Sequence, residues 1–568
     1  MNTSLLRFGL LSGFCAGSLL MTAKPSAAAE RVTLTYGFAE ISTSVEALRV
    51  YAETGKVDKE LAPYIRFLNE EQRSQFRAAL NAKQDVSPVA ISQFLYSSIG
   101  SNILRYMGDI IQTQGRRTGS KGLRGALVLA AAEPGGISLL GVLENFPTNA
   151  VRIDSRRAFQ AFGAFTQLIQ NTERAIAAIE KQAAPAQLIG IPALPDLAQI
   201  GPQTVTAETF TITDVERDRA MPVDLYLPDV PNAPLIVISH GLAGDRKGFA
   251  PMIQHLASHG YAVAALDHPG SNTEQFIALL SGSAREIAKP TEFTERPRDV
   301  SYLLDELTRR NEVNGVLAGR LNMGKVGIIG HSFGGYTALA LAGAKLNFNT
   351  LKSNCESPAF IYNAANPSML LQCTALLAPE QFEDDLRDDR IQAVMAINPV
   401  TSSLFGPTGF AQIAIPSLLV SGTGDPIAPA LLEQIRPFTW LNRPKPEGVA
   451  TPDHFLALIQ GGSHLYDPPE LEGNTDIALA NELINADIPL AYSYLKAMSL
   501  GFMEAEVNDN AVYKAAFTDA SIVQIGQQPL PLYIVETLTE AMLKPVPAVP
   551  TVIETAPSNT AVPPEPTQ

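Results

Sequence analysis

The stretch KVGIIGHSFGGYTALALAGAK, residues 325–345, decides the fold of the chain. Residues 325–329 form a short β-branched run, and residues 336–345 are small and apolar, as in a buried helix. Between them lies Gly330-His331-Ser332-Phe333-Gly334-Gly335. A serine on a tight strand-to-helix turn needs neighbours without bulky side chains, because the strand and the helix approach closely there. The stretch therefore predicts a nucleophilic serine, Ser332, on such a turn.

Other short β-rich runs occur on both sides of this stretch. They lie at 205–212, 223–227, 235–239, 261–266, 326–329, 393–397, 417–421 and 455–459. The first runs have hairpin-like spacing, and helical stretches separate most of the later ones. This order predicts α/β architecture: a mostly parallel sheet with helices on both faces and an antiparallel edge.

The serine needs two partners to act as a nucleophile. A base must take its proton, and a carboxylate must hold that base in the right tautomer. The best base is His464, just beyond the run at 455–459, where a loop can bring its side chain over the carboxyl edge of the sheet. The best acid is Asp425, after the run at 417–421. The chain order Ser332, Asp425, His464 is that of the nucleophile-elbow hydrolases.

Other histidines compete for these roles. His454 with Asp453 is an alternative pair, although both residues precede the last run instead of following it. His268, in Asp267-His268-Pro269-Gly270, either lines the pocket or belongs to a structural turn. His331 lies beside the serine, and we expect it to pack against the serine loop.

The developing oxyanion requires preorganised backbone donors. One candidate is the N–H of Phe333, the residue after the serine. The other is the N–H of Leu242, in the sequence HGLAG at 240–244 that follows the run at 235–239. An ordinary glycine turn is the alternative interpretation of HGLAG.

Residues from about 205 to 500 resemble the α/β-hydrolase superfamily, and specifically the secreted platelet-activating-factor acetylhydrolase-like and dienelactone-hydrolase-like esterases. The resemblance rests on HGLAG at 240–244, GHSFGG at 330–335, GTGDPIAP at 422–429, GGSH at 461–464 and RPRD at 296–299. Dienelactone hydrolases proper use cysteine as the nucleophile, so the serine in this chain favours the esterase or lipase side.

The resemblance implies a role for each matching residue. Ser332 would be the nucleophile, Asp425 the acid and His464 the base, with Leu242 and Phe333 as oxyanion donors. It implies no metal and no cofactor. The sequence thus predicts a serine carboxylester hydrolase acting on a small-molecule or lipid ester. A serine peptidase or amidase of the same fold, and a non-catalytic binding protein, remain alternatives.

Composition limits the other partners. The 568 residues carry a formal charge of −15, with a pI near 5.1, which argues against the basic surface that nucleic-acid binding needs. With 46% hydrophobic and 17% charged residues the chain is globular, and its length favours two domains. The oligomeric state stays open.

The N-terminus predicts export. Residues 1–29 combine Arg7, an apolar stretch and the small residues Ala27-Ala28-Ala29, which is typical of a cleaved signal peptide; an uncleaved anchor is the alternative. We therefore expect an extracytoplasmic protein without a stable membrane span. Cleavage would remove Cys15 and leave Cys355 and Cys373, which predicts a disulfide, with two buried free thiols as the alternative.

The rest of the chain divides by composition. Helix start signals such as Thr43 with Glu46 and Asn69 with Gln72 predict a separate helical domain at 30–182. A proline-rich linker at 183–203, a catalytic domain at 204–543 and a disordered proline-rich tail at 544–568 follow. In the catalytic domain, the long segments 271–297 and 346–390 are expected to cap the pocket, with surface decoration as the alternative.

Overall fold

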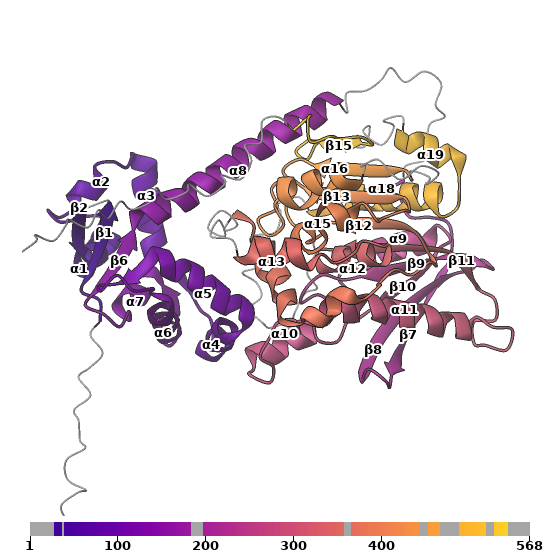
Figure 1. Ribbon diagram of the computed structural model, residues 1–568, viewed down its shortest axis with the longest axis horizontal. Helices are drawn as coiled ribbons and strands as arrows, with labels where there is room; N and C mark the ends of the chain where they lie inside the picture. Colours follow the sequence, from indigo (N-terminus) through magenta and orange to yellow (C-terminus); the bar gives the residue numbers. More distant parts are fainter. Residues whose placement is uncertain are drawn as a thin grey trace, which may run out of the picture. The chain divides into compact units, whose positions relative to one another are not determined.

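The computed structural model describes residues 28–36, 39–182, 197–356, 365–441, 452–465, 488–518 and 528–543. The predicted signal peptide up to residue 27, the predicted linker up to residue 196 and the predicted tail at 544–568 lie outside the described residues. The chain divides into two compact units (Figure 1). The first comprises Met1–Ser92 and Leu104–Ala158, and the second comprises Gln93–Ile103 and Phe159–Gln568.

The first unit contains a small sheet in addition to its helices. Its strand order is β2-β1-β6-β4, in which β1 pairs antiparallel with β2 and parallel with β6. The strands are β1(Arg31–Tyr36), β2(Ala39–Ser44), β4(Ile111–Thr113) and β6(Ala150–Asp154), and β3(Lys83–Gln84) pairs separately with β5(Ile137–Ser138). The predicted helical domain therefore contains a sheet as well as helices. The β1–β2 hairpin is local, but pairs such as Val32 and Val151 are far apart in the sequence, so no local pattern reveals the pairing of β1 with β6.

Some helices of this region begin at or next to the capping signals found in the sequence. They are α1(Val45–Thr54), α2(Ala62–Ile65), α3(Glu70–Asn81), α4(Pro88–Tyr96), α5(Ser98–Ile110), α6(Ser120–Ala131), α7(Leu139–Glu144) and α8(Ser155–Gln182). The capping box of α3 is present, with Asn69 and Gln72 each accepting from the other's backbone N–H. Helix α1 is capped by Ser44, one residue after the predicted Thr43, because the Ser44 hydroxyl accepts from the N–H of Ala47.

The predicted boundary at residue 182 is also corrected. Parts of α4 and α5 and most of α8 belong to the second unit. Ile99 of α5 and Ile176 and Ile179 of α8 are buried in the same hydrophobic cluster as the strands of that unit. Burial of these apolar side chains is the reason why the two helices extend the second unit.

The second unit is built on a nine-stranded sheet. Its strands are β7(Val205–Asp214), β8(Arg219–Pro228), β9(Ala233–Ser239), β10(Ala262–Leu266), β11(Leu321–His331), β12(Ile391–Ile397), β13(Ser417–Gly422), β14(His454–Ile459) and β15(Leu532–Val535). They occur in the order β15-β14-β13-β12-β11-β9-β10-β8-β7. The six central strands are parallel, and β7, β8 and β15 run antiparallel to their neighbours. The predicted mostly parallel sheet with an antiparallel edge is confirmed, and β15 adds a second antiparallel edge.

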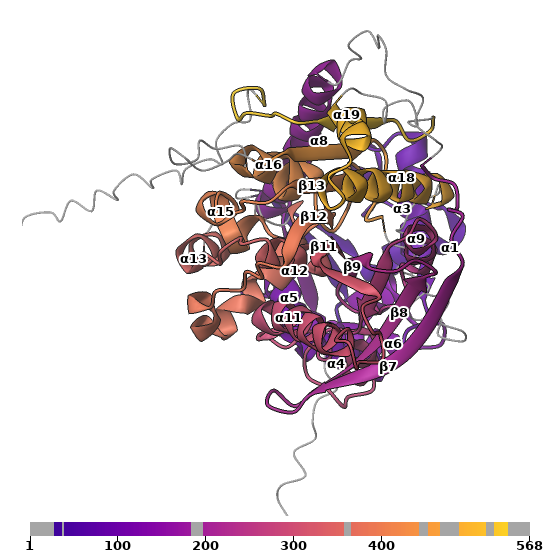
Figure 2. The same ribbon diagram turned by 90° about the vertical axis from the view of Figure 1, so that its right-hand side faces the viewer.

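Helices cover both faces of this sheet, as Figure 2 shows for α9 and α18 on one side and α11 and α12 on the other. The helices are α9(Ala250–Ser258), α10(Thr273–Leu280), α11(Glu292–Arg310), α12(Phe333–Leu341), α13(Phe348–Glu356), α14(Ser368–Gln372), α15(Ser402–Phe410), α16(Arg436–Leu441), α18(Ile488–Glu506) and α19(Ala511–Thr518), with the short turns η2(Cys373–Leu377), η3(Pro379–Glu383) and η4(Leu431–Ile435). No helix among the described residues combines the length and apolarity needed to cross a bilayer.

Alternating side chains of the strands divide the core between the two faces. Leu235 and Val237 of β9 belong to one hydrophobic cluster, whereas Ile236 and Ile238 belong to the other. A strand covered on both faces is apolar on both sides, which explains the unbroken apolar run at 235–238. Because the central strands are parallel, the loops after β9, β11, β12, β13 and β14 all emerge at one edge of the sheet.

Candidate active site

Ser332 stands on a strained turn between β11 and α12. Its backbone has φ 55° and ψ −114°, a conformation that non-glycine residues rarely adopt. A side chain at Gly330 would overlap the carbonyl oxygen of Gly334, and one at Gly334 would overlap that of Ser239. The two glycines are therefore required for the close approach of strand and helix. The turn is held in place by the N–H of Ser332, which donates to the carbonyl of Ile397 at 2.8 Å.

Asp425 and His464 meet at the same edge of the sheet. Asp425 lies in the loop after β13 and His464 in the loop after β14, and Nδ1 of His464 is 2.7 Å from Oδ2 of Asp425. The other carboxylate oxygen accepts the N–H groups of Ile427 at 2.7 Å and Ala428 at 2.9 Å. The carboxylate cannot donate when ionised, so Nδ1 of His464 carries the proton and Nε2 is the free base position.

The environment of Asp425 favours its ionised form. Burial opposes ionisation, but His464, the N–H of Ala428 and the amide of Asn398 outweigh burial, so the pKa of Asp425 lies below its usual value. A permanent carboxylate at this position can orient the imidazole and stabilise its protonated form.

His331 connects the serine turn to the base. Nε2 of His331 donates to the carbonyl of His464 at 2.7 Å, and the two rings lie with their centroids 4.7 Å apart. Burial, together with His464, lowers the pKa of His331 to about 3, so this imidazole is neutral. His331 precedes Ser332 directly, and its bond to the backbone of His464 therefore brings the base to the serine turn.

The loop at 240–244 lies against the same turn. A Cβ atom on Gly241 would be 3.0 Å from Nδ1 of His331 and 3.3 Å from Cβ of Ser332. Ala243 has φ 58°, and its N–H donates to the carbonyl of Ser271. Among the described residues, the N–H groups of Leu242 and Phe333 have no hydrogen-bond acceptor. Neither N–H group is therefore committed to another hydrogen bond among the described residues.

The competing histidines have other surroundings. Asp453, the partner in the alternative pair, forms an ion pair with Lys514 at 2.8 Å, and His454 is the buried first residue of β14. His268 is fully buried, with Nε2 at 2.9 Å from the hydroxyl of Ser239 and Nδ1 at 3.0 Å from Asp299. It belongs to a buried hydrogen-bond network with Ser239, Asp299 and His240.

Sequence reasoning missed Asn398, which contacts the acid directly. Its side-chain amide donates to Oδ2 of Asp425 and, at 3.2 Å, to the carbonyl of Ser463. Asn398 follows β12 and has φ 44°, a left-handed conformation that asparagine tolerates better than most residues. An Asn-Pro pair directly after a predicted strand was the available signal.

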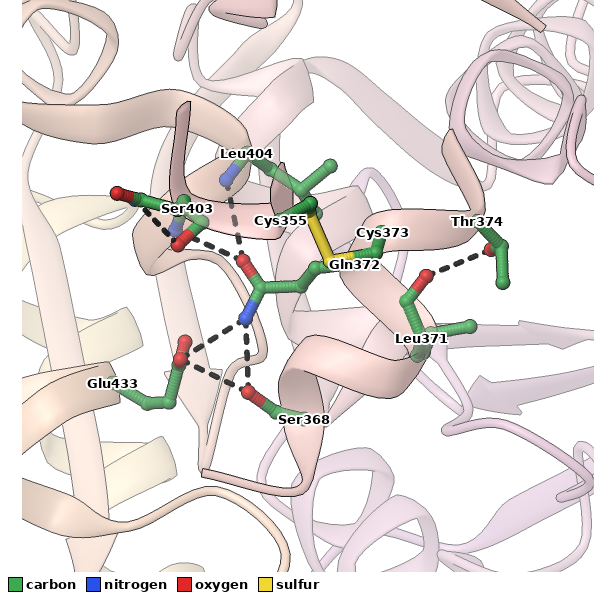
Figure 3. Close-up of a disulfide and its surroundings, with 10 residues drawn as sticks. Cys355, Ser368, Leu371, Gln372, Cys373, Thr374, Ser403, Leu404 and Glu433 are labelled. Atoms are coloured by element: carbon green, nitrogen blue, oxygen red, sulfur yellow. Dashed lines mark hydrogen bonds between the residues drawn. A yellow bond between two sulfur atoms is a disulfide. The ribbon is translucent and has the colours of Figure 1, made fainter. Parts of the chain in front are cut away.

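The segment 346–390, which the sequence predicts to cap the pocket, contains both Cys355 and Cys373, and Figure 3 shows them bonded. Cys355 lies near the C-terminus of α13, and Cys373 is the first residue of η2. Their Cα atoms are 5.8 Å apart. The neighbouring Gln372 donates to Ser368 and Glu433 and accepts from the backbone of residues 403 and 404. Part of this segment, residues 357–364, lies outside the described residues.

The same segment is also hydrogen-bonded to the loop after β13, which carries Asp425. The N–H of Ser368 donates to the carbonyl of Ile427 at 2.9 Å, and the N–H of Ile427 donates to Asp425. The segment held by the disulfide is therefore two hydrogen bonds away from the proposed acid.

The nine-stranded, mostly parallel sheet with helices on both faces is an α/β-hydrolase fold, and the comparisons agree. A model described as the alpha/beta hydrolase fold matches residues 234–357, which include the serine turn and the 240–244 loop. A second model, described as an alpha/beta hydrolase of unknown function (DUF1400), matches residues 28–154, which lie outside the nine-stranded sheet.

One curated relative is similar to part of the chain. It is the platelet-activating factor acetylhydrolase of Cavia porcellus, 30% identical over 134 residues. The alignment covers 19% of this chain and 31% of the relative, so the chain spans about a third of the length of the relative it matches. The similarity supports hydrolase activity.

Proposed function

We propose that this chain is a serine carboxylester hydrolase that acts on acetyl or other short acyl esters of lipids or small molecules. The observation that supports this most is the convergence of Ser332, Asp425 and His464 at one edge of the sheet, with two free backbone N–H groups beside the serine. The name of the guinea pig relative, an acetylhydrolase, favours short acyl groups.

The reaction would proceed in two halves. Ser332 Oγ attacks the ester carbonyl carbon while His464 Nε2 takes the hydroxyl proton, and Asp425 stabilises the resulting imidazolium. The tetrahedral intermediate collapses when His464 returns the proton to the leaving alcohol, which leaves an acyl-enzyme on the serine. Water then attacks the acyl group with His464 again as the base, releasing the carboxylic acid and restoring Ser332.

The oxyanion of each tetrahedral intermediate needs donors that are already in position. The N–H groups of Leu242 and Phe333 would supply them, because neither has to give up another bond first. Such donors contribute about 10²- to 10³-fold to turnover in hydrolases of this kind.

We also propose that the protein works outside the cytoplasm after cleavage near Ala29. The signal-like N-terminal sequence and the pair Cys355 and Cys373 support this location. N-terminal sequencing of the exported protein tests it, with a mature chain beginning near Glu30 as the expected result.

Two measurements on the purified full-length chain test the activity. A short-chain aryl ester should be hydrolysed, and a fluorophosphonate probe should label Ser332, as located by peptide mass spectrometry. The matching aryl amide serves as the comparison. Faster cleavage of the amide would indicate a peptidase or amidase, and neither turnover nor labelling would indicate a binding protein. A panel of acyl esters, phospholipids and polyesters would then define the substrate.

A further inference from the structure

Arg296 contacts both segments that carry the proposed oxyanion donors. It lies on α11 and is fully buried. Its guanidinium nitrogen Nη2 donates to the carbonyl of His240 at 2.5 Å, two residues before Leu242. Its Cζ atom lies 4.5 Å from the centroid of the Phe333 ring. One side chain therefore touches the 240–244 loop and the residue after the serine.

The tautomer of His240 directs this contact to the backbone. The N–H of His268 donates to Nε2 of His240 at 3.0 Å, so Nε2 is unprotonated and Nδ1 carries the proton. That proton is donated to the carbonyl of Gly241 at 2.7 Å. Burial, with the charge of Arg296, holds the pKa of His240 well below its usual value, and the ring stays neutral. The acceptor left for Arg296 is the His240 carbonyl.

An ordinary ion pair does not explain why Arg296 is buried. The nearby carboxylates of Glu292 and Asp299 are bound by Arg219, at 2.8 Å and 2.6 Å. Among the described residues, Nε and Nη1 of Arg296 have no hydrogen-bond partner. Burying a cation with such incomplete pairing is unfavourable. The burial of Arg296 therefore needs a reason other than an ion pair, and its contacts with His240 and Phe333 suggest one.

Pro297, the residue after Arg296, leaves a carbonyl of α11 available for a hydrogen bond from α12. Pro297 has no N–H, so the carbonyl of Phe293, four residues earlier, has no helical donor. The hydroxyl of Tyr336 on α12 donates to it at 2.7 Å. Helix α11 thus holds the helix that follows the serine through Tyr336, in addition to the ring of Phe333 through Arg296.

We propose that Arg296 is a positioning residue that fixes the spacing between the Leu242 and Phe333 N–H groups. The inference rests on the proposed esterase function, because the two donors matter only if an oxyanion forms between them. Arg296 touches neither the substrate nor the reacting atoms. It acts on the 240–244 loop through the His240 carbonyl, and on the serine turn through the Phe333 ring.

The test compares Arg296→Met and Arg296→Lys with Arg217→Met. Methionine keeps much of the length of the side chain but removes the charge and the donors, whereas lysine keeps one charged donor without the planar face. Arg217 is the matched control, because it binds Glu295 and Asp299 in the same network at 2.7 Å and 3.0 Å. No contact joins Arg217 to His240 or Phe333 among the hydrogen bonds of the described residues.

The readout that separates positioning from stability is the preference for an aryl ester over its thionoester. Sulfur accepts hydrogen bonds more weakly than oxygen, so misplaced donors slow the oxygen ester more. For Arg296→Met we expect kcat to fall about 10- to 100-fold, which is at most the effect of removing one oxyanion donor. KM should stay within about threefold of the wild-type value. The preference should fall by a similar factor. Arg296→Lys should lie between Arg296→Met and the wild type, and Arg217→Met should keep the wild-type preference even if it melts at a lower temperature.

A second readout does not depend on activity. Hydrogen exchange of peptides covering 240–244 and 333–336 should speed up in Arg296→Met and not in Arg217→Met. If the wild-type protein neither turns over esters nor reacts with the fluorophosphonate, the proposed function is wrong, and exchange alone decides whether Arg296 holds the two segments.

The inference is overturned if folded Arg296→Met retains both the wild-type ester preference and wild-type exchange in these peptides. If Arg296→Met does not fold, Arg296→Lys decides by the same two criteria. A loss of thermal stability equal to that of Arg217→Met, without either change, would mark Arg296 as merely structural.

Discussion

The side-chain amide of Asn398 donates to Oδ2 of Asp425, the same carboxylate oxygen that faces Nδ1 of His464. Three loops of the sheet, after β12, β13 and β14, are joined by this pair of bonds. Oδ2 is thereby held between two donors, which fixes the carboxylate and, through it, the imidazole. Asn398 is buried, so water cannot replace its amide without rearrangement.

Asn398→Gly should lower kcat about tenfold with little change in KM. The substitution removes the hydrogen bond from the side-chain amide to the charged carboxylate, which helps to orient the base. If this raises the activation free energy by about 1.4 kcal/mol, the rate falls tenfold. Steady-state kinetics with the aryl ester measure the effect. Asn398→Ala is the control: it should lose the same turnover but more stability, because it places a Cβ at φ 44°. Wild-type kcat in the glycine variant would contradict the role of the amide.

Ser332→Ala should leave the fold intact and reduce ester turnover by several orders of magnitude. The triad acts as a unit, so any residual rate comes from the oxyanion donors and substrate binding. We expect the melting temperature to change by only a few degrees, since the side chain is small and the glycines that permit the turn remain. Labelling of the alanine variant by fluorophosphonate at another serine would show that the nucleophile is elsewhere.

Much of the second unit follows from local sequence patterns, because its central strands are nearly continuous apolar runs. The eight predicted runs all become strands of the large sheet. Strand β15 was missed because its four residues, Leu532–Val535, are a short run whose partner strand β14 lies far earlier in the chain. The pairing of β1 with β6 in the first unit could not be predicted for the same reason, since the two strands are more than a hundred residues apart.

The candidate site was accessible to prediction where residue type and strand position agree. Ser332, Asp425 and His464 each follow a predicted strand and each have a side chain suited to one step of acyl transfer. Asn398 occupies an equivalent place after β12, but an amide has neither nucleophilic nor basic chemistry to reveal it. The contacts of Arg296 depend on how α11 packs against two distant loops, which no spacing in the sequence shows.

His464→Ala should abolish turnover, whereas His454→Ala should stay near wild-type kcat. His464 is the histidine bonded to Asp425, and the neighbour of His454, Asp453, is paired with Lys514 instead. His454 is buried, so its replacement should still cost stability, and both variants need a thermal unfolding curve beside the kinetics. The opposite pattern of activities would move the base to His454 while leaving the serine-hydrolase class intact.

Cys355 and Cys373 should be disulfide-bonded in the exported protein. Alkylation of the denatured, unreduced chain should label neither thiol, and reduction beforehand should expose both. The bond closes a loop with a sequence separation of 18, so Cys373→Ser should lower the free energy of unfolding by about 3 kcal/mol. Two alkylatable thiols without reduction would end this prediction.

Loss of that disulfide should also lower the activity of the proposed site. Gln372, next to Cys373, and Ser368 belong to the segment that bonds Ile427 and thereby supports Asp425. We expect a modest fall in kcat on reduction, about two- to fivefold, given that the backbone bonds at Asp425 are stabilised only indirectly. Unchanged kcat in the fully reduced, folded protein would show that the disulfide-bonded segment does not affect Asp425.

The protein should lose stability as the pH falls below about 6.5. Burial, followed by the charge of His259, lowers the pKa of His255 to about 4. The unfolded chain, with a histidine pKa near 6.5, binds the proton first, so protons favour unfolding between these two values. The stabilising effect of the neutral imidazole is complete above about pH 6.5 and is lost as the pH falls to about 4, at up to about 1.4 kcal/mol per pH unit.

His255→Leu isolates this contribution, because every other titrating group is shared with the wild type. Its urea-unfolding free energy should fall less steeply with acid than that of the wild type, and the gap between the two slopes should disappear above pH 7. His255 is fully buried on α9, beside His259 and Lys496, and leucine is an uncharged residue of similar size. Equal slopes from pH 7 to pH 4.5 would mean that His255 takes up its proton as readily in the folded chain as in the unfolded one.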